Sequence, residues 1–307
     1  MSRRRFIKQV GATSALLSLA PLQLLASNDE LVKITILHTN DMHSRIEAFS
    51  SGRNKGLGGM LQLSSMVKEI RKKEENVLLL DAGDIFQGTP YFNYFGGELE
   101  FKLMSEMGFD ASTIGNHDFD NGIDGFVKQL PHANFPFLSA NYDFSNTDLQ
   151  KRTIPHKIFY KNGLKIGVFG IGIELAGLVD PKLYGDALYI DPIAVANQQA
   201  EVLKKEQQCD LVICLSHLGY KYNSNKVSDC VLATQTQNID LIIGGHTHTF
   251  LKSAVSLENS KGKEVLISQV GFGAIKLGKI DFYLKKEGIK KVARCTALDV
   301  QKRAKFV

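Results

Sequence analysis

The stretch TIGNHDFDNG, residues 113–122, gathers an amide, an imidazole and two carboxylates within five positions. Asn116 and His117 come first, and Asp118 and Asp120 follow. The apolar run FDASTIG precedes them, which predicts that these polar groups stand at the end of a strand. An imidazole beside carboxylates can carry protons near neutral pH, and the same side-chain types bind metals. The chemistry becomes specific only if other parts of the chain supply matching groups.

Four further polar clusters stand at the downstream ends of predicted strands. The chain runs from TILH into TNDMH, from VLLLD into AGDIFQG, from VICLS into HLG, and from LIIGG into HTH. Binding groups collect beyond the carboxyl ends of strands in open α/β sheets, and five of the eight histidines have this position. These clusters contribute the candidate groups Asp41, His43, Asp84, His217, His246 and His248.

Together with Asn116, these residues form a set of candidate metal ligands. Imidazoles and carboxylates suit borderline divalent ions such as Zn, Mn or Fe. A tetrahedral ion rarely takes more than about four ligands, whereas a larger set with one shared carboxylate can hold two ions about 3.5–4 Å apart. Each motif alone could be a polar turn or a surface loop without a function. This explanation would have to hold for all five motifs together, so the set favours a binding site. The other histidines, His38, His132 and His156, are interpreted as structural or surface residues.

Strands that alternate with helices are predicted to position these clusters. Apolar runs rich in Val, Ile and Leu recur along the chain, at 32–38, 76–81, 165–171, 210–216, 239–245, 264–270 and 277–284. Helical patterns lie between several of them, in GGMLQLSSMVKEIRKKEE, in GELEFKLMSEMG and in DPIAVANQQAEVLKKEQ. Gly108 is a predicted helix stop, and Asp191 is a predicted N-cap before a first-turn proline. This alternation predicts an α/β architecture.

Composition and charge exclude several classes of protein. The chain has 307 residues, of which 44% are hydrophobic and 22% charged, and this balance is typical of a folded protein. The net charge of +5 depends on four basic residues within positions 1–26, a segment without acidic residues. Without that segment the chain has 33 basic and 32 acidic side chains, so no nucleic-acid-binding patch is expected.

The N-terminus is predicted to direct export. A basic start, a stretch of small and apolar residues and a small residue at Ala26 are the three parts of a signal peptide. The pattern Ser2-Arg3-Arg4-x-Phe6-Ile7-Lys8 resembles the twin-arginine (Tat) signal. We therefore expect residues 1–26 to be the signal, the protein to be periplasmic or otherwise extracytoplasmic, and membrane contact to be limited to this segment. The alternative is an uncleaved anchor, for which an apolar run of about 17 residues is marginal.

Four cysteines occur late in the chain, at Cys209, Cys214, Cys230 and Cys295. Cys214 lies in LVICLS and is predicted to be buried, whereas the others could pair in an oxidising compartment. None belongs to a CxxC pattern, so a cysteine zinc site is not expected.

The motifs ILHTNDMH, DAGDIFQGTP, TIGNHDFDNG, SHLG and GGHTH occur in this order. Together they resemble the calcineurin-like metallophosphoesterases, and more narrowly the catalytic domain of bacterial 5'-nucleotidases, over roughly residues 32–285. The resemblance implies a four-layer αββα sandwich with a dinuclear site at one edge. It implies that one ion is held by Asp41, His43, Asp84 and His248, with Asp84 bridging to a second ion held by Asn116, His217 and His246. His117 would be the catalytic histidine and Asp120 would orient it, with Asp118 as the competing partner.

The same resemblance implies hydrolysis of nucleotides or other phosphate esters by in-line attack of a metal-bound hydroxide on phosphorus. Full-length 5'-nucleotidases carry a second, C-terminal domain that supplies substrate contacts. Because this chain ends at Val307, we expect residues 27–307 to form a single catalytic domain without it. Three alternatives follow: a separate protein resembling that domain docks here, the enzyme acts alone with loose specificity, or the substrate differs, as in the related exported thiohydrolase of sulfur oxidation. A different class of protein is also considered: a non-catalytic metal- or phosphate-binding protein. Because every expected ligand type is present, the sequence favours an enzyme over this alternative.

Overall fold

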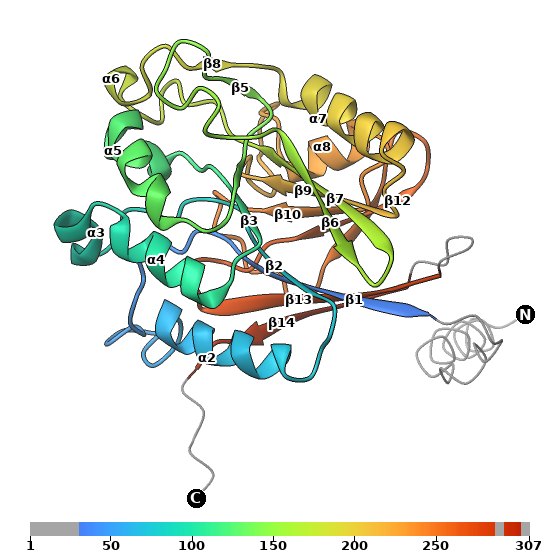
Figure 1. Cartoon of the computed structure of the whole chain (residues 1–307), viewed down its shortest axis with the longest axis horizontal. Coiled ribbons are helices and arrows are strands. Elements are labelled where there is room, and N and C mark those ends of the chain that lie inside the picture. Colours follow the sequence, from blue (N-terminus) through green and yellow to red (C-terminus); the bar gives the residue numbers. More distant parts are fainter. Residues whose placement is uncertain (1–30, 286–291, 302–307) are drawn as a thin grey trace, which may run out of the picture.

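Two six-stranded β-sheets form the centre of the computed structural model, which describes residues 31–285 and 292–301 (Figure 1). The first sheet has the strand order β14-β13-β1-β2-β3-β4. Neighbours among β1 to β4 run parallel, whereas β13 and β14 add to the edge in antiparallel fashion. The bounds of these strands are β1 (Val32–Thr39), β2 (Val77–Asp81), β3 (Ala111–Thr113), β4 (Phe137–Leu138), β13 (Lys276–Leu284) and β14 (Val292–Asp299).

The second sheet has the strand order β11-β12-β10-β9-β7-β6. Its four central strands run parallel, and β11 and β6 close the two edges as antiparallel strands. The strands are β6 (His156–Lys161), β7 (Leu164–Ile171), β9 (Leu211–Ser216), β10 (Leu241–Gly244), β11 (Val255–Glu258) and β12 (Glu264–Ser268). A separate two-stranded ladder joins β5 (Tyr142–Asp143) to β8 (Leu188–Tyr189).

The two sheets pack face to face through one apolar layer. Ile36 and Leu80 from the first sheet belong to the same buried cluster as Val168, Ile213 and Ile243 from the second. The central strands are buried on both faces, and this is why their sequences are continuous apolar runs rather than alternating patterns. The inter-sheet layer therefore fixes how the ends of the two sets of parallel strands meet.

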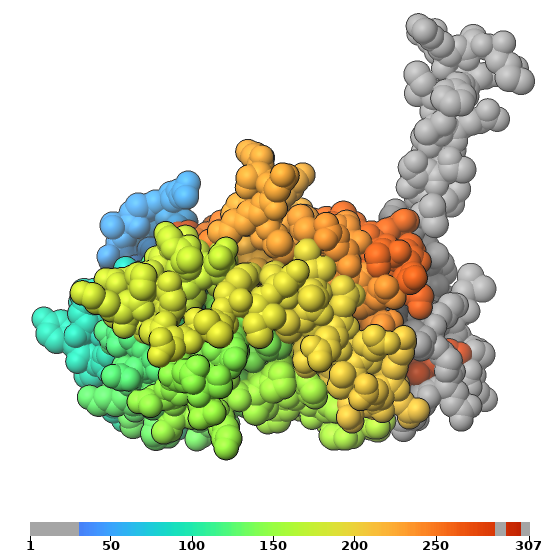
Figure 2. All heavy atoms as spheres, turned by 90° about the horizontal axis from the view of Figure 1, so that it is seen from above, coloured from blue at the N-terminus to red at the C-terminus, as the bar shows by residue number. Residues whose placement is uncertain are grey.

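Helices cover the outer face of each sheet. The first sheet packs against α2 (Met60–Arg71), α4 (Glu98–Met107) and α5 (Gly122–Gln129). The second packs against α7 (Pro192–Glu201) and α8 (Asp229–Gln235). Figure 1 shows α2 below the sheets and α7 above them, and in Figure 2, which is seen from above, the yellow segments around α6 and α7 lie across the middle of the surface. The predicted α/β class and the αββα layering are confirmed.

Shorter elements connect these layers. They are the helices α3 (Pro90–Phe95) and α6 (Pro181–Tyr184), the 3-10 turns His117–Phe119 and Leu130–His132, and a π-helical continuation of α7 over Val202–Glu206. The predicted caps are confirmed: Gly108 ends α4 with φ 72°, and the Asp191 carboxylate accepts a hydrogen bond from the backbone N–H of Ile193 at 2.8 Å.

Three expectations about covalent links and membranes have separate outcomes. All four cysteines are free thiols, so the alternative of a disulfide among them is not realised, and Cys214 is buried as predicted. The predicted signal at positions 1–26 lies outside the described residues. Within the described ranges, no helix has the length and apolar character needed to cross a bilayer.

Candidate metal centre and active site

Five loops meet where parallel strands of both sheets end. Three loops come from the first sheet, after β1, β2 and β3, and two come from the second, after β9 and β10. Because the sheets stack face to face, the carboxyl ends of these strands share one edge of the sandwich. The structure brings the predicted residues together there: Asp41, His43, Asp84, Asn116, His117, Asp120, His217, His246 and His248.

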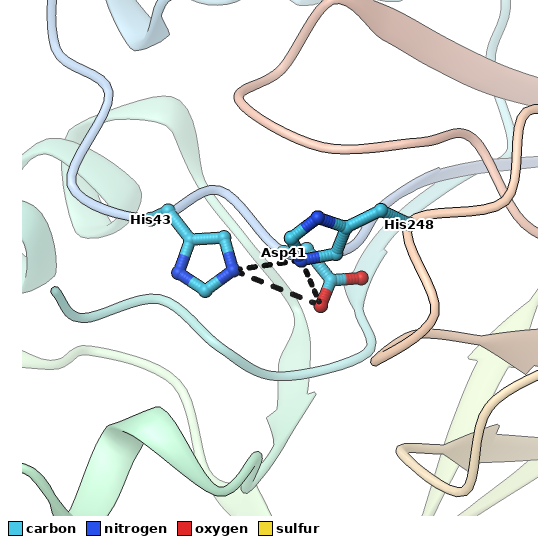
Figure 3. Close-up of side chains that lie close together, drawn as sticks. All are labelled: Asp41, His43 and His248. Atoms are coloured by element: carbon cyan, nitrogen blue, oxygen red, sulfur yellow. Dashed lines mark hydrogen bonds and ion pairs between the residues drawn. The ribbon is translucent and has the colours of Figure 1, made fainter. Parts of the chain in front are cut away.

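Asp41, His43 and His248 form one group of converging ligand atoms (Figure 3). The Nε2 atoms of His43 and His248 lie 3.0 Å apart, and His248 Nε2 lies 3.4 Å from the Asp41 carboxylate. His43 Nδ1 lies 3.2 Å from the carbonyl oxygen of Phe86. Because a carbonyl only accepts hydrogen bonds, Nδ1 carries the proton, and the lone pair of Nε2 faces the group. This arrangement of one carboxylate and two imidazoles suits a divalent transition metal.

Asp84, His217 and His246 form a second group beside the first. His217 Nδ1 donates to the carbonyl of Ala82 at 2.6 Å, so its Nε2 also offers a lone pair. That Nε2 is fully buried and lies 3.0 Å from Asp84 Oδ2, yet it makes no aligned hydrogen bond. An orphaned nitrogen beside a carboxylate oxygen is expected where both atoms point to a shared cation. Asn116 completes this group, because its Oδ1 lies 2.8 Å from His246 Nδ1.

The Asp84 carboxylate lies between the two groups. Its Oδ2 is 3.0 Å from His217 Nε2 and 3.8 Å from His43 Nε2, and these nitrogens belong to different groups. Its Oδ1 accepts a hydrogen bond from the backbone N–H of His117 at 2.8 Å. One carboxylate oxygen is therefore within reach of both sets of ligands, as a bridging position requires.

His117 stands beside the two groups rather than within either. Its Nδ1 makes a 2.9 Å hydrogen bond to Asp120 Oδ2, and its side chain is 39% exposed. The hydrogen bond to Asp120 raises the pKa of His117, which favours the protonated ring. The ring centroid lies 5.3 Å from that of His43, so an exposed proton donor faces the candidate metal centre.

Asp118 has a different role from Asp120. It is fully buried, and its two oxygens accept hydrogen bonds from the backbone N–H groups of Asp84, Ile85, Phe86 and Gly115 at 2.8–3.1 Å. It ties the loop after β2 to the loop after β3. The interpretation of Asp118 as the partner of His117 therefore has no support in the geometry.

The charges of the site favour a bound cation. Burial lowers the pKa of His43, and it lowers the pKa of His246 to about 4, which leaves both rings neutral and able to coordinate. Burial alone would also lower the pKa of His217, but the Asp84 carboxylate raises that pKa to about 10. The negative charge of Asp84 that raises this pKa equally favours a divalent cation at this position.

The loops adopt a backbone conformation that non-glycine residues seldom take. Asp41, His43, Asp84, His246 and His248 all have positive φ, between 48° and 71°. Such conformations cost about 1 kcal/mol or more each and persist where the surroundings impose them. Here the loops bind one another: Asp41 N–H donates to the carbonyl of Gly83 at 2.9 Å, and His246 N–H donates to the Asp41 carboxylate at 2.9 Å.

Two glycines permit the close approach of these loops. A Cβ on Gly115 would lie 2.2 Å from Asp84 Oδ1, and a Cβ on Gly245 would lie 2.7 Å from His217 Nδ1. The glycines of the GNHD and GGHTH motifs are therefore required by the site itself.

Sequence reasoning missed three buried residues that support the ligands. Asn40 Nδ2 donates to Asp41 Oδ2 at 2.6 Å, and Gln269 Nε2 donates to the carbonyl of Gly245 at 2.6 Å. Asp229 accepts from the hydroxyl of Ser216 at 2.6 Å, next to the loop of His217. Asn40 lies within the TNDMH motif and could have been found, whereas Gln269 lies inside the predicted apolar run 264–270 and Asp229 lies on α8, so neither carries a local signal.

The remaining histidines lie outside the site. His38 is buried between the sheets, where Nε2 lies 2.9 Å from the hydroxyl of Ser268. His156 Nδ1 pairs with Gln199 at 2.6 Å, and His132 lies 3.9 Å from Glu98.

The calcineurin-like phosphoesterase family model matches residues 34–250, and the chain belongs to this family. It is 35% identical to a 5'-nucleotidase of Vibrio parahaemolyticus, over 80% of this chain and 46% of the relative. It is 36% identical to a snake venom 5'-nucleotidase of Crotalus adamanteus, over 76% of this chain and 39% of the relative. The crystal structure of a 5'-nucleotidase precursor from Thermus thermophilus superposes with a TM-score of 0.79 at 27% identity, covering 88% of this chain and 55% of that one. The chain thus spans less than half the length of these two curated relatives.

Proposed function

We propose that this protein is an extracytoplasmic, dinuclear metal-dependent phosphoesterase of the 5'-nucleotidase type. The observation that carries the proposal is the position of Asp84, whose Oδ2 lies 3.0 and 3.8 Å from imidazole nitrogens of two separate ligand groups. Membership of the calcineurin-like phosphoesterase family and the similarity to proteins named 5'-nucleotidase support the reaction class.

The residues divide into two ligand sets and one proton carrier. Asp41, His43 and His248 would hold one ion, Asn116, His217 and His246 would hold the other, and Asp84 would serve both. When bound, two ions of Zn, Mn or Fe supply positive charge to phosphoryl oxygens and lower the pKa of water. His117, held by Asp120, would donate a hydrogen bond or a proton from Nε2 to an oxygen of the substrate. The chain also excludes water from Asp41 and His217, which are both fully buried.

Nucleotides are the proposed substrates, because relatives over most of this chain are named 5'-nucleotidases. The longer relatives contain further residues beyond the matched region. A segment resembling that remainder, on the same polypeptide or on a separate protein, would add substrate contacts at the open edge of the sandwich.

The decisive experiment measures phosphate release from nucleotides and other phosphate esters. The purified protein should release phosphate in the presence of Mn²⁺ or Zn²⁺ and lose this activity after chelation. Absence of release from every monoester, diester and nucleotide tried would refute the proposal.

Export by the Tat route is proposed from the N-terminal pattern, and one relative is by its name a venom protein. Replacement of Arg3 and Arg4 by Lys should retain the protein in the cytoplasm, as measured by cell fractionation. Unchanged export of this variant would exclude the Tat route.

A further inference from the structure

Ser44, the residue that follows the candidate ligand His43, is fully buried and paired on all its polar groups. Its N–H donates to the carbonyl of Ile85 at 2.8 Å, and its carbonyl accepts from the Thr89 hydroxyl at 2.8 Å. Its own hydroxyl donates to Oε1 of Glu100, in the first turn of α4. His43 and Ser44 both have positive φ, of 48° and 53°. These hydrogen bonds therefore hold a backbone conformation that non-glycine residues seldom take.

Glu100 is a buried carboxyl group whose presence needs an explanation. Its side chain has no exposed surface, and its Oε2 has no hydrogen-bond partner within the described ranges. Burial raises the pKa of this carboxyl group. A buried carboxyl with an unpaired oxygen costs free energy, and an apolar side chain of similar volume would avoid this cost. The hydrogen bond from Ser44 is the contact that an apolar side chain could not replace.

The start of α4 also holds the imidazole of His43 from a second direction. His43 Nδ1 donates to the carbonyl of Phe86 at 3.2 Å, and the ring of Phe86 stacks on that of Phe101 with centroids 4.8 Å apart. A Cβ on Gly97, the N-cap of α4, would overlap the Phe86 ring, so the helix start packs directly on this residue. The first turn of α4 is therefore connected both to the backbone after His43 and to the residue that sets its tautomer.

These contacts lead to one ligand group and not to the other. His43 belongs to the first group, whereas His217 in the second group is oriented by the carbonyl of Ala82. In the part of the chain that the structure describes, no hydrogen bond of the Glu100 side chain goes to a residue of the second group. Removal of a group that orients a metal-binding histidine typically lowers metal affinity by about 10–100-fold. A loss of this kind is expected here at one ion only.

We propose that Glu100 is a positioning residue for His43 and sets the affinity of the first ligand group for its ion. It acts through the hydroxyl of Ser44 rather than by contact with the ion. The inference rests on the proposed function, because it assumes that Asp41, His43 and His248 hold a divalent ion. It distinguishes the two ion sites by their support, since the first depends on α4 and the second does not.

The test pairs Glu100→Met with Glu100→Gln and measures Mn²⁺ binding by titration calorimetry. The Met variant keeps the volume and removes the acceptor, so the affinity for one ion should fall by about 10–100-fold. The Gln variant keeps an oxygen that can accept from Ser44, so both affinities should stay close to the wild-type values. Anomalous diffraction from crystals of the Met variant at limiting Mn²⁺ should show the lost occupancy at Asp41, His43 and His248. An equal loss at both sites, or no loss in the Met variant, would overturn the inference.

Ser44→Ala tests the proposed connection between Glu100 and His43. This change and Glu100→Met should each weaken the first site. The double variant should bind the first ion no more weakly than the weaker of the two single variants, because both changes remove the same hydrogen bond. Losses that multiply in the double variant would overturn the inference.

The stability of the metal-free protein separates positioning from a purely structural role. Glu100→Met should leave the free energy of unfolding unchanged or raise it, because an apolar side chain replaces a buried carboxyl. The matched control is Asp281→Ala, which removes another buried carboxylate that accepts from a hydroxyl on β1, that of Thr35 at 2.8 Å. This control should lower stability and change neither ion affinity. A comparable loss of Mn²⁺ affinity in the control would overturn the inference.

Ion binding is measured without a phosphate ester, so this inference and the proposed function can fail separately. If the wild type binds two ions but hydrolyses no ester, the proposed function fails, and the titrations alone decide the role of Glu100. A wild type that binds no Mn²⁺ would overturn the inference.

Discussion

Asp118 and Asp120 lie two positions apart and have unrelated roles. Asp118 is fully buried and accepts hydrogen bonds from four backbone N–H groups, whereas Asp120 is partly exposed and holds the ring of His117 at 2.9 Å. The difference follows from the 3-10 turn at His117–Phe119, which directs the first carboxylate into the protein and returns the second to the imidazole. A pair of matched substitutions should separate the two roles.

Asp118→Asn should destabilise the fold, because its amide group would face N–H donors and leave about two of them without an acceptor. The expected loss in the free energy of unfolding is about 2–5 kcal/mol, measured by denaturant titration. Asp120→Asn should change that free energy by about 0.5 kcal/mol or less and instead lower kcat about tenfold or more. A stable Asp118→Asn protein would contradict the structural role given to this carboxylate.

His117→Ala tests the separation of the proton carrier from the metal ligands. The substitution should lower kcat by about 10²–10⁴-fold, because the proton donor is removed. The metal content should stay near that of the wild type, since His117 belongs to neither ligand group. Elemental analysis measures this content, and His132→Ala serves as a histidine control outside the site. Loss of both metals from the His117 variant would show that the ring supports the ligands.

Strand β1 carries two kinds of polar group. Asp41 lies just past the end of β1, in a loop that carries candidate metal ligands, whereas His38 lies within the strand and is buried between the sheets. Burial lowers the pKa of His38 from 6.5 to about 3, and its Nδ1 has no hydrogen-bond partner. The neutral ring thus connects β1 to Ser268 on β12 at 2.9 Å and helps to hold the stacked sheets in register.

His38 should make stability depend on pH. Its pKa in the folded protein is about 3 and its ordinary value is 6.5, so between these values the unfolded chain binds one more proton than the folded one. The free energy of unfolding should therefore fall as pH drops below about 6.5, by about 1.4 kcal/mol per pH unit from this group. Denaturant titrations of the wild type and of His38→Gln should show a shallower slope for the variant. An identical slope would exclude His38 as the source.

The site as a whole joins the two halves of the sandwich. Asp41, His43, Asp84 and Asn116 follow strands of the first sheet, and His217, His246 and His248 follow strands of the second. Each group of ligand atoms contains residues from both sheets. A bound ion would therefore link the sheets at the edge where their strands end.

Saturating metal should raise the thermal stability of the protein. At about 100 times the dissociation constant, one bound ion adds about 2.7 kcal/mol to the free energy of unfolding, which raises Tm by several degrees. Differential scanning calorimetry with Mn²⁺ or Zn²⁺, before and after chelation, measures this shift. Asp84→Asn should abolish most of it and lower the affinity for both ions, because one carboxylate serves both groups. Two tightly held ions in that variant would contradict the bridging position.

The candidate ligands could be recognised from short stretches of sequence alone, because each polar motif directly follows an apolar run and such runs form strands. The long helices were predictable for the same reason, since Gly108 and Asp191 mark their ends. Helix α3 has too few residues for a clear period, and β6 has the sequence HKIFYK, which is not a continuous apolar run, so their sequences do not predict them.

Contacts between distant segments depended on the tertiary structure. The stacking of the two sheets decides that His217 meets Asp84 across 133 positions of sequence. The place of Asp84 between two ligand groups follows from the same packing. Asp118 joins two loops of the first sheet and Gln269 supports a loop of the second, so both depend on neighbouring strands within one sheet. Side-chain type and spacing determine which residues can do chemistry, but only the fold determines which of them share one point in space.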